Sequence, residues 1–165
     1  MNPRTAAMLI QQCRFCVIAT ASRAAQPWLS PVFFNYDDDL SIYFESAADA
    51  LHSQLIAVNP KVAVVITDFE TDPAPRAVYL EGKAFAVDLS EIDHALQVLE
   101  HGPHHRERKS RQASDYGAGS PLRLYRAVPH RLFGLRAVDV DGYSVEQRVD
   151  LSLVDVRLHL QSLPD

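Results

Sequence analysis

The sequence predicts a mainly β domain with short helices, arranged as a small barrel. Short runs rich in aromatic and β-branched residues recur along the chain, and turn residues separate them. The early connections are too short for crossover helices, so neighbouring strands are expected to pair antiparallel. Helical patterns are too few for repeated strand–helix–strand units, which favours a barrel or sandwich over a parallel α/β sheet.

Length and composition indicate one folded domain. The chain has 165 residues, of which 47% are hydrophobic, enough to bury a core. No linker or internal repeat divides it. We therefore expect a single domain over residues 1–165, with a core at about 13–138 and a C-terminal arm at 139–165.

The net charge and the absence of targeting patterns indicate which partners and which location to expect. The formal net charge is −5, so no global positive field attracts nucleic acid or an anionic membrane, and we expect neither partner. No apolar run approaches the roughly 18 residues that span a bilayer, and the first residues lack a signal-peptide pattern, so a cytoplasmic protein is expected. Cys13 and Cys16 cannot staple a domain of this size and are interpreted as structural thiols.

The N-terminal residues predict a helix followed by a strand. Asn2 and Pro3 are helix-start signals, and the helix is expected to end near Cys13. The run Phe15–Thr20 is a compact apolar strand. The residues expected on one face of the helix are Ala6, Ala7, Leu9 and Ile10.

The stretch Gln26–Ser46 is predicted to be a β-hairpin. It holds one run at Val32–Tyr36 and a second at Ile42–Phe44, joined by three aspartates. Alternate side chains of any barrel strand fill the interior, so most of these residues are expected in the core.

A helix and two strands are expected next. Leu51, Leu55 and Val58 have helical spacing, and the proline of Asn59-Pro60 ends the helix. Strands follow at Val62–Ile66 and Ala77–Val87. Within the second strand, Gly82 is expected at a bulge or a close backbone contact.

The C-terminal half predicts a further helix and two strands. Ser90 is a candidate N-cap for a helix with an apolar stripe that ends at Gly102. Residues 104–111 form a basic cluster, interpreted as an exposed loop. Strands are expected at 122–128 and 132–138, broken at Pro129, and the tail beyond Gly142 is expected to be a strand or a docked arm.

Four segments, in order and spacing, resemble a known superfamily. They are QPWLSPVFFNYDD, IYFES, VNPKVAVVI and VYLEGKAFAV, and they are similar to the pyridoxamine 5′-phosphate oxidase-like, FMN-binding split-barrel proteins over roughly residues 13–136. The resemblance implies a six-stranded Greek-key split barrel and a homodimer with two FMN sites at the interface. It also implies that residues 30–35 run beside the flavin ring and that residues 46–53 hold its phosphate.

The resemblance assigns cofactor-binding residues one by one. Ser46 stands where the family has a phosphate-binding serine or threonine, whereas Leu51 replaces a basic residue. Leucine offers no charge-assisted donor, so His52 and Arg76 are the candidates to compensate, with Lys83 a weaker one. The implied cofactor-binding residues are Ser30, Pro31, Val32, Phe33, Asn35, Ser46, His52, Ser53 and Arg76.

The activity implied is a flavin-dependent oxidoreduction of an unknown small molecule. Ser30 and Asn35 replace positions that are basic in the pyridoxamine phosphate oxidases, so that particular activity is not expected. The flavin supplies the redox chemistry, and no catalytic side chain is assigned.

Several alternatives remain open at the level of sequence. Ser46 alone is an ordinary helix cap, and His52 alone an ordinary helix residue. A haem-binding or haem-degrading split barrel would use His130 or His159 as axial ligand. A third alternative is a cofactor-free binding module. His101, His104 and His105 lack the further ligands of a metal site.

Overall fold

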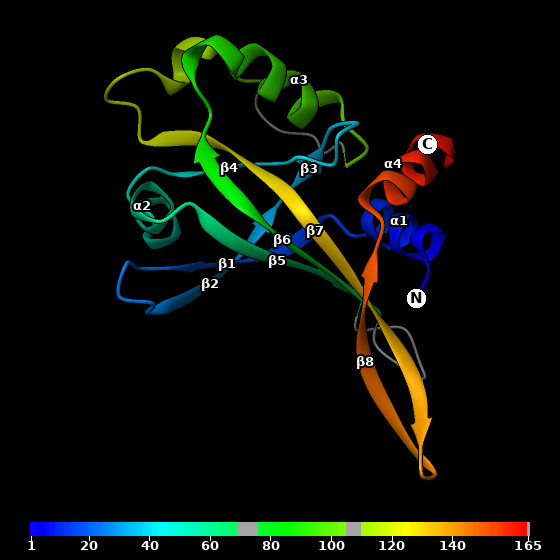
Figure 1. Cartoon of the computed structure of the whole chain (residues 1–165). Coiled ribbons are helices and arrows are strands. Elements are labelled where there is room, and N and C mark those ends of the chain that lie inside the picture. Colours follow the sequence, from blue (N-terminus) through cyan, green and yellow to red (C-terminus); the bar gives the residue numbers. More distant parts are fainter. Residues whose placement is uncertain (69–75, 105–109, 165) are drawn as a thin grey trace.

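The computed structural model describes residues 1–68, 76–104 and 110–164, which form a curled antiparallel sheet with four α-helices and a projecting two-stranded arm (Figure 1). The elements in chain order are α1 (Pro3–Gln12), β1 (Phe15–Ala21), β2 (Pro27–Phe33), β3 (Asn35–Tyr36), β4 (Ile42–Ala47), α2 (Leu51–Val58), β5 (Lys61–Asp68), β6 (Arg76–Ala86), the 3₁₀ turn η1 (Leu89–Glu91), α3 (Ile92–His101), the 3₁₀ turn η2 (Ala113–Tyr116), β7 (Leu122–Val140), β8 (Tyr143–Leu151) and α4 (Leu153–Ser162).

The sheet confirms the predicted fold class, a mainly β split barrel with short helices. Its strand order is β2-β1-β5-β6-β7-β4-β3, and β2 at one end lies beside β4 near the other. The described residues hold eight strands, whereas the resemblance implied six. The difference has a physical origin, because β3 has only two residues and β8 pairs only with the outer part of β7.

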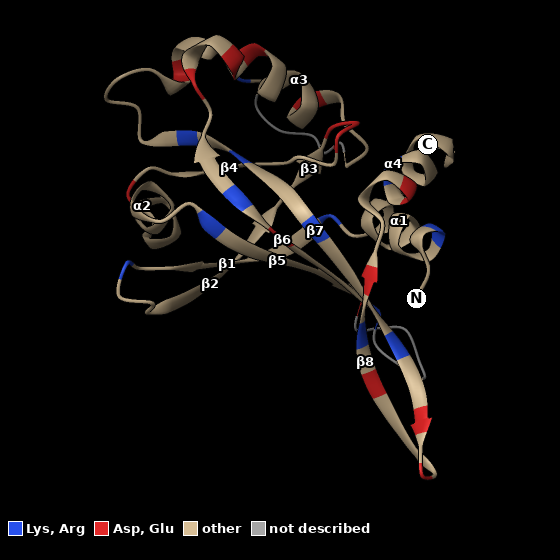
Figure 2. Cartoon of the chain, in the orientation of Figure 1, with Lys and Arg blue, Asp and Glu red and all other residues tan. Residues whose placement is uncertain are grey.

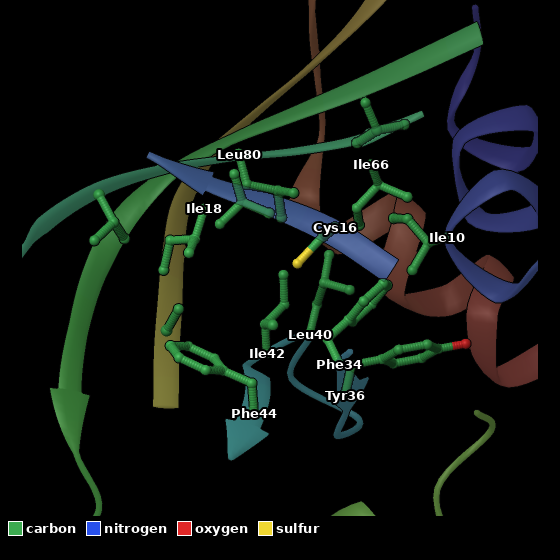
Figure 3. Packing of buried hydrophobic residues seen from close by; sticks show 14 of the residues in the cluster. Ile10, Cys16, Ile18, Phe34, Tyr36, Leu40, Ile42, Phe44, Ile66 and Leu80 are labelled. Atoms are coloured by element: carbon green, nitrogen blue, oxygen red, sulfur yellow. The ribbon is translucent and has the colours of Figure 1, made fainter. Parts of the chain in front are cut away.

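A continuous core fills the barrel. The buried face of α1 consists of the residues predicted for it, Ala6, Ala7, Leu9 and Ile10. These pack with inward side chains of β1, β4, β5 and β6, such as Ile18, Ile42 and Ile66 (Figure 3). A second cluster lies under α3, where Ile92, Leu96 and Leu99 contact Tyr43 and Leu124.

The predicted hairpin forms only in its second half. Asn35 and Tyr36 pair with Tyr43 and Ile42, but residues 27–33 pair with β1 instead. The break falls at Phe34, which is fully buried and donates its backbone N–H to the Arg14 carbonyl. Burial of this side chain therefore splits the expected strand into β2 and β3.

The bulge predicted at Gly82 is confirmed, and it corrects the prediction of two strands broken at Pro129. The β6–β7 register shifts between Glu81 and Gly82, and His130 is the extra residue of β7. A side chain at Gly82 would clash with the Val128 carbonyl, so glycine permits the close approach. The proline falls at this irregularity, where β7 continues unbroken to Val140.

Two further elements differ from expectation. Helix α3 begins after η1, with Glu91 rather than Ser90 as the N-cap residue and no side-chain cap bond. The tail begins with the expected strand, β8, and continues into a helix that was not predicted, α4. Val156 of α4 is fully buried, and the Ser152 hydroxyl caps its N-terminus. Most of the basic cluster at 104–111 lies outside the described residues.

No helix among the described residues is long and apolar enough to cross a membrane.

Candidate functional site

A chain of hydrogen bonds joins four polar side chains where α2 meets the β2–β4 end of the barrel. The Trp28 indole N–H donates to Ser30 Oγ at 3.0 Å. Ser30 Oγ lies 3.0 Å from His52 Nδ1, and His52 Nε2 lies 2.7 Å from Ser46 Oγ. Ser30 and His52 are each 8% exposed, so water does not compete for these bonds. Three residues predicted from sequence, Ser30, Ser46 and His52, are thus brought into direct contact.

The indole gives this chain a direction. Because Trp28 can only donate, Ser30 accepts from it, and the Ser30 O–H is left to donate elsewhere. In the His52 tautomer protonated on Nε2, Ser30 donates to Nδ1 and Nε2 donates to Ser46, so the Ser46 O–H is available to an acceptor. Burial lowers the pKa of His52, so the ring is neutral at neutral pH and serves as a relay of hydrogen bonds rather than as a cation.

Ser46 lies next to the N-terminus of α2, a second source of donors. The N-cap residue is Ala50, and no described side chain caps this eight-residue helix. Its first backbone N–H groups therefore retain their capacity to bind an acceptor such as a phosphate oxygen. Ser53 donates its hydroxyl to the Ala47 carbonyl at 2.7 Å and so fixes the turn between β4 and α2.

The other wall of the candidate site is β2, an edge strand. In the described sheet β2 pairs only with β1, which leaves one row of its backbone groups unpaired. Ser30 and Val32 point inward and are buried, while Pro31 is exposed on the opposite side. An edge of this kind offers backbone N–H and C=O groups to the polar rim of a planar ligand.

The outward side of β1 and β2 is apolar and exposed. Phe15 is 61% and Leu29 64% exposed, and Phe15 packs edge-to-face on Phe33 with ring centres 5.8 Å apart. Cross-strand registers place these residues on one side of the sheet with their β5 neighbours. We call this surface the outer face, and it consists of Phe15, Val17, Ala19, Leu29, Pro31, Phe33, Ala63 and Val65.

Two predicted site residues lie elsewhere. Asn35 is fully buried, and its Oδ1 accepts the backbone N–H groups of Tyr36 and His104. Arg76 pairs with Asp68 at 2.8 Å, at the start of β6. The Ser46 end of the barrel adjoins the other end of β6, ten residues and roughly 30 Å away. Within one chain, Arg76 therefore cannot replace the cation missing at Leu51.

Arg123 is the cation that sequence reasoning missed. It is the cross-strand partner of Ser46, so both side chains leave the sheet on the same side. Its guanidinium donates to the carbonyls of Ser120 and Leu122 at 2.9 and 2.8 Å, which holds the charge near the β4–β7 end. Only the strand register reveals this proximity, because the two residues are 77 positions apart in sequence.

Among the residues that the structure describes, the other histidines and cysteines form no metal site. No group of three metal-ligating side chains occurs within the described ranges. Cys13 and Cys16 are free thiols, and burial raises the pKa of Cys16 to about 12. His130 lies in a groove of about 440 Å³ with Lys61 and Lys83, whereas His159 lies on α4.

Comparison with known proteins identifies the sequence family. A family model described as pyridoxamine 5′-phosphate oxidase matches residues 3–118. No curated protein matched the sequence.

Solved structures share the fold at low sequence identity. A haem-binding protein from Mycobacterium smegmatis has a TM-score of 0.66 and 18% identity, and the match covers 94% of this chain and 60% of that protein. A FAD-binding protein from Mesorhizobium loti has a TM-score of 0.60 and 19% identity, and the match covers 81% of this chain and 94% of that protein. A haem storage protein from Vibrio cholerae has a TM-score of 0.55 and 16% identity, and the match also covers 81% of this chain and 94% of that protein. This chain therefore spans three fifths of the mycobacterial protein.

Proposed function

Because the chain belongs to the pyridoxamine 5′-phosphate oxidase family, we propose that it is a homodimeric FMN-binding protein that oxidises or reduces a small molecule. The observation that carries the proposal is the Ser46–His52–Ser30 cluster at the uncapped N-terminus of α2, directly beside the edge strand β2. In this arrangement the polar cluster would donate to a phosphate, and the neighbouring backbone edge would face a planar ring.

The donor set fits a phosphate without an arginine at position 51. Ser46 offers an O–H that His52 and Ser30 orient, and the first turn of α2 offers backbone N–H groups and the positive end of its dipole. Arg123 adds a guanidinium on the same side of the sheet as Ser46. Ser53 keeps the β4–α2 turn in place.

The chain itself would bind and orient the flavin, and it would exclude water from the ring. A bound flavin supplies the electron transfer, so no side-chain acid or base is required. The edge strand would hold the ring's polar rim through main-chain groups of residues 30–33, while Pro31 and Phe33 give the ring apolar contact.

A second copy of the chain is the proposed partner for the outer face. Contiguous apolar surface of this kind on a soluble protein marks an interaction site. The face includes Pro31 and Phe33, so a copy seated there would cover the ring side of β2 as well. The cofactor would then lie between two subunits, which agrees with the resemblance stated above.

The proposal is tested by titrating the purified protein with FMN, with riboflavin as the ligand that lacks the phosphate. We expect FMN to bind at micromolar concentration and more tightly than riboflavin. Leu51→Arg should raise FMN affinity about tenfold, because one charge-assisted bond contributes about 1.5–3 kcal/mol.

Val58→Arg is the matched control for this substitution. Val58 and Leu51 are both 44% exposed, but Val58 lies at the other end of α2. It should leave FMN affinity unchanged. Absence of FMN binding in both the native protein and Leu51→Arg would contradict the proposal.

Haem is the second candidate, favoured by the groove at His130. Lys61 and Lys83 are cross-strand partners beside this groove, so they could pair with the two propionates while His130 ligates the iron. A Soret band that forms on adding haem and is lost in His130→Ala, but not in His159→Ala, would support this candidate. An unchanged band in both variants would exclude the groove as the haem site.

A further inference from the structure

A second cavity, separate from the cluster around Ser46, lies between the β3–β4 turn and the two terminal helices. Its volume is about 540 Å³, within the range of small-molecule sites. The carboxylates of its lining are Asp37 and Asp38, on the turn. Its opposite wall comes from α1 and from α4 with the residues after it, and α4 lies beyond the part of the chain that the family model matches. The lining residues on that wall include Gln11, Gln12, Leu160, Gln161 and Leu163.

Tyr36 projects into this cavity from the barrel core. The residue is 7% exposed, and its ring packs against Phe34 and His104. Figure 3 shows its oxygen directed away from the core residues, toward the helices. Tyr36 lines the cavity, and its hydroxyl makes no hydrogen bond to any described group. Burial raises the pKa of Tyr36 to about 12, so the hydroxyl stays protonated and retains lone pairs to accept a donor.

The charged residues in the described lining of the cavity are Asp37 and Asp38, and Arg157 of α4 lies 3.9 Å from the neighbouring Asp39. Figure 2 shows the acidic β3–β4 turn close to α4. Asp37 Oδ1 accepts the backbone N–H groups of Asp39 and Ser41, and Asp37 Oδ2 accepts the Tyr43 hydroxyl at 3.1 Å, so these bonds fix the turn that lines the cavity. Asp38 is exposed, and no Lys or Arg is among the described lining residues. Glutamine amides and leucine side chains complete the surface.

From this combination we infer that the cavity is a binding site for a small organic cation, a protonated amine or guanidinium on a short apolar chain. The cation would lie against Asp37 and Asp38 and donate to the Tyr36 hydroxyl, while its chain would contact Leu160 and Leu163. The observation that carries the inference is the Tyr36 phenol, which is nine-tenths buried and has no described hydrogen-bond partner for its hydroxyl. It faces a cavity whose described lining holds two carboxylates and no Lys or Arg. This site is independent of the flavin proposal.

The test compares three probes that share one apolar chain and differ only in charge: hexylammonium, hexanol and hexanoate. Each is titrated into the full chain at pH 7 while the backbone amide resonances of the β3–β4 turn and α4 are followed by NMR. We expect hexylammonium to shift these resonances with saturation at millimolar concentration, hexanol to bind more weakly, and hexanoate not to bind.

Two variants and one control locate the site. Asp38→Asn should weaken hexylammonium binding about twofold to fivefold, the range of an exposed ion pair. Tyr36→Phe removes only the hydroxyl and should weaken binding about threefold to tenfold. Asp88→Asn is the matched control, because Asp88 is an exposed aspartate that does not line the cavity and has no ion pair among the described residues, whereas Asp39 pairs with Arg157.

The inference is overturned if hexylammonium and hexanoate bind equally, if neither binds at about 20 mM, or if Asp88→Asn weakens binding as much as Asp38→Asn. The measurements on FMN are made on the same protein without these probes. Failure of the cation site would therefore leave the flavin proposal standing, and the reverse also holds.

Discussion

The two sides of the β1–β2 pair both carry apolar residues, but these residues have very different surroundings. On the inner side, Cys16, Ile18 and Val32 are 3%, 1% and 7% exposed. On the outer side, Phe15 and Leu29 are more than half exposed, although they are equally apolar. Strand alternation places these two sets on opposite faces. The inner set is covered by the rest of the chain, whereas the described residues leave Phe15 and Leu29 largely exposed.

This difference shows which apolar residues fold the chain and which are left for association. Burial within the barrel stabilises the single chain, at roughly 25 cal/mol for each Å² of apolar surface removed from water. The same free energy is available on the outer face only when a second surface covers it. Substitutions on the inner face should therefore change the free energy of unfolding, whereas substitutions on the outer face should change association.

The largest effect on folding is expected on the inner face. Ile18→Ala leaves a cavity in the core and should lower the free energy of unfolding by about 2–5 kcal/mol. Val17→Ala changes the neighbouring outer residue and should cost less than about 1 kcal/mol. Urea denaturation of both variants at one low protein concentration makes the comparison. Equal losses would mean that the two faces are not distinguished by burial.

On the outer face, the expected effect is on association. Leu29→Glu places a charge at a 64% exposed position, so the monomer should keep its stability within about 0.5 kcal/mol while a dimer dissociates. Leu89→Glu, at a 72% exposed position on η1 outside the outer face, is the control and should stay dimeric. Sedimentation velocity distinguishes these results. A native protein that sediments only as monomer would contradict the dimer.

Local patterns in the sequence predicted most elements, because helices and strands here follow caps, prolines and periodicity. The start of α1 at Asn2-Pro3 and the bulge at Gly82 are signals of that kind. The break at Phe34 and the continuity of β7 through Pro129 were not predictable. Both depend on tertiary packing, namely burial of a ring between α1 and the barrel and a bulge opposite Gly82.

The candidate site divides in the same way. Ser46, His52 and Ser30 were placed by resemblance to a family, and the structure brings them within hydrogen-bonding distance. The roles of Trp28 and Arg123 depend on side-chain direction and cross-strand register, which no local pattern encodes. The separation of Arg76 from Ser46 within one chain is likewise not visible in a local pattern, since it is set by the length of β6.

The smallest effect tests the polar part of the inner face, where His52 is buried against Ser30. Burial lowers the pKa of His52 below the ordinary 6.5, so as the pH falls His52 is protonated in the unfolded chain before it is protonated in the folded chain. Stability from this residue should therefore be complete above pH 6.5 and decline as the pH falls below it. In urea denaturation between pH 7.5 and 5, the free energy of unfolding should fall less steeply for His52→Gln than for the native protein.

Two other histidines serve as references for this measurement. His104 is also buried with a lowered pKa, so it contributes in the same direction and should leave some pH dependence in the His52→Gln variant. His101→Gln changes an exposed residue and should keep the native dependence of the unfolding free energy on pH. If His52→Gln also kept that dependence, folding would not disfavour protonation of His52.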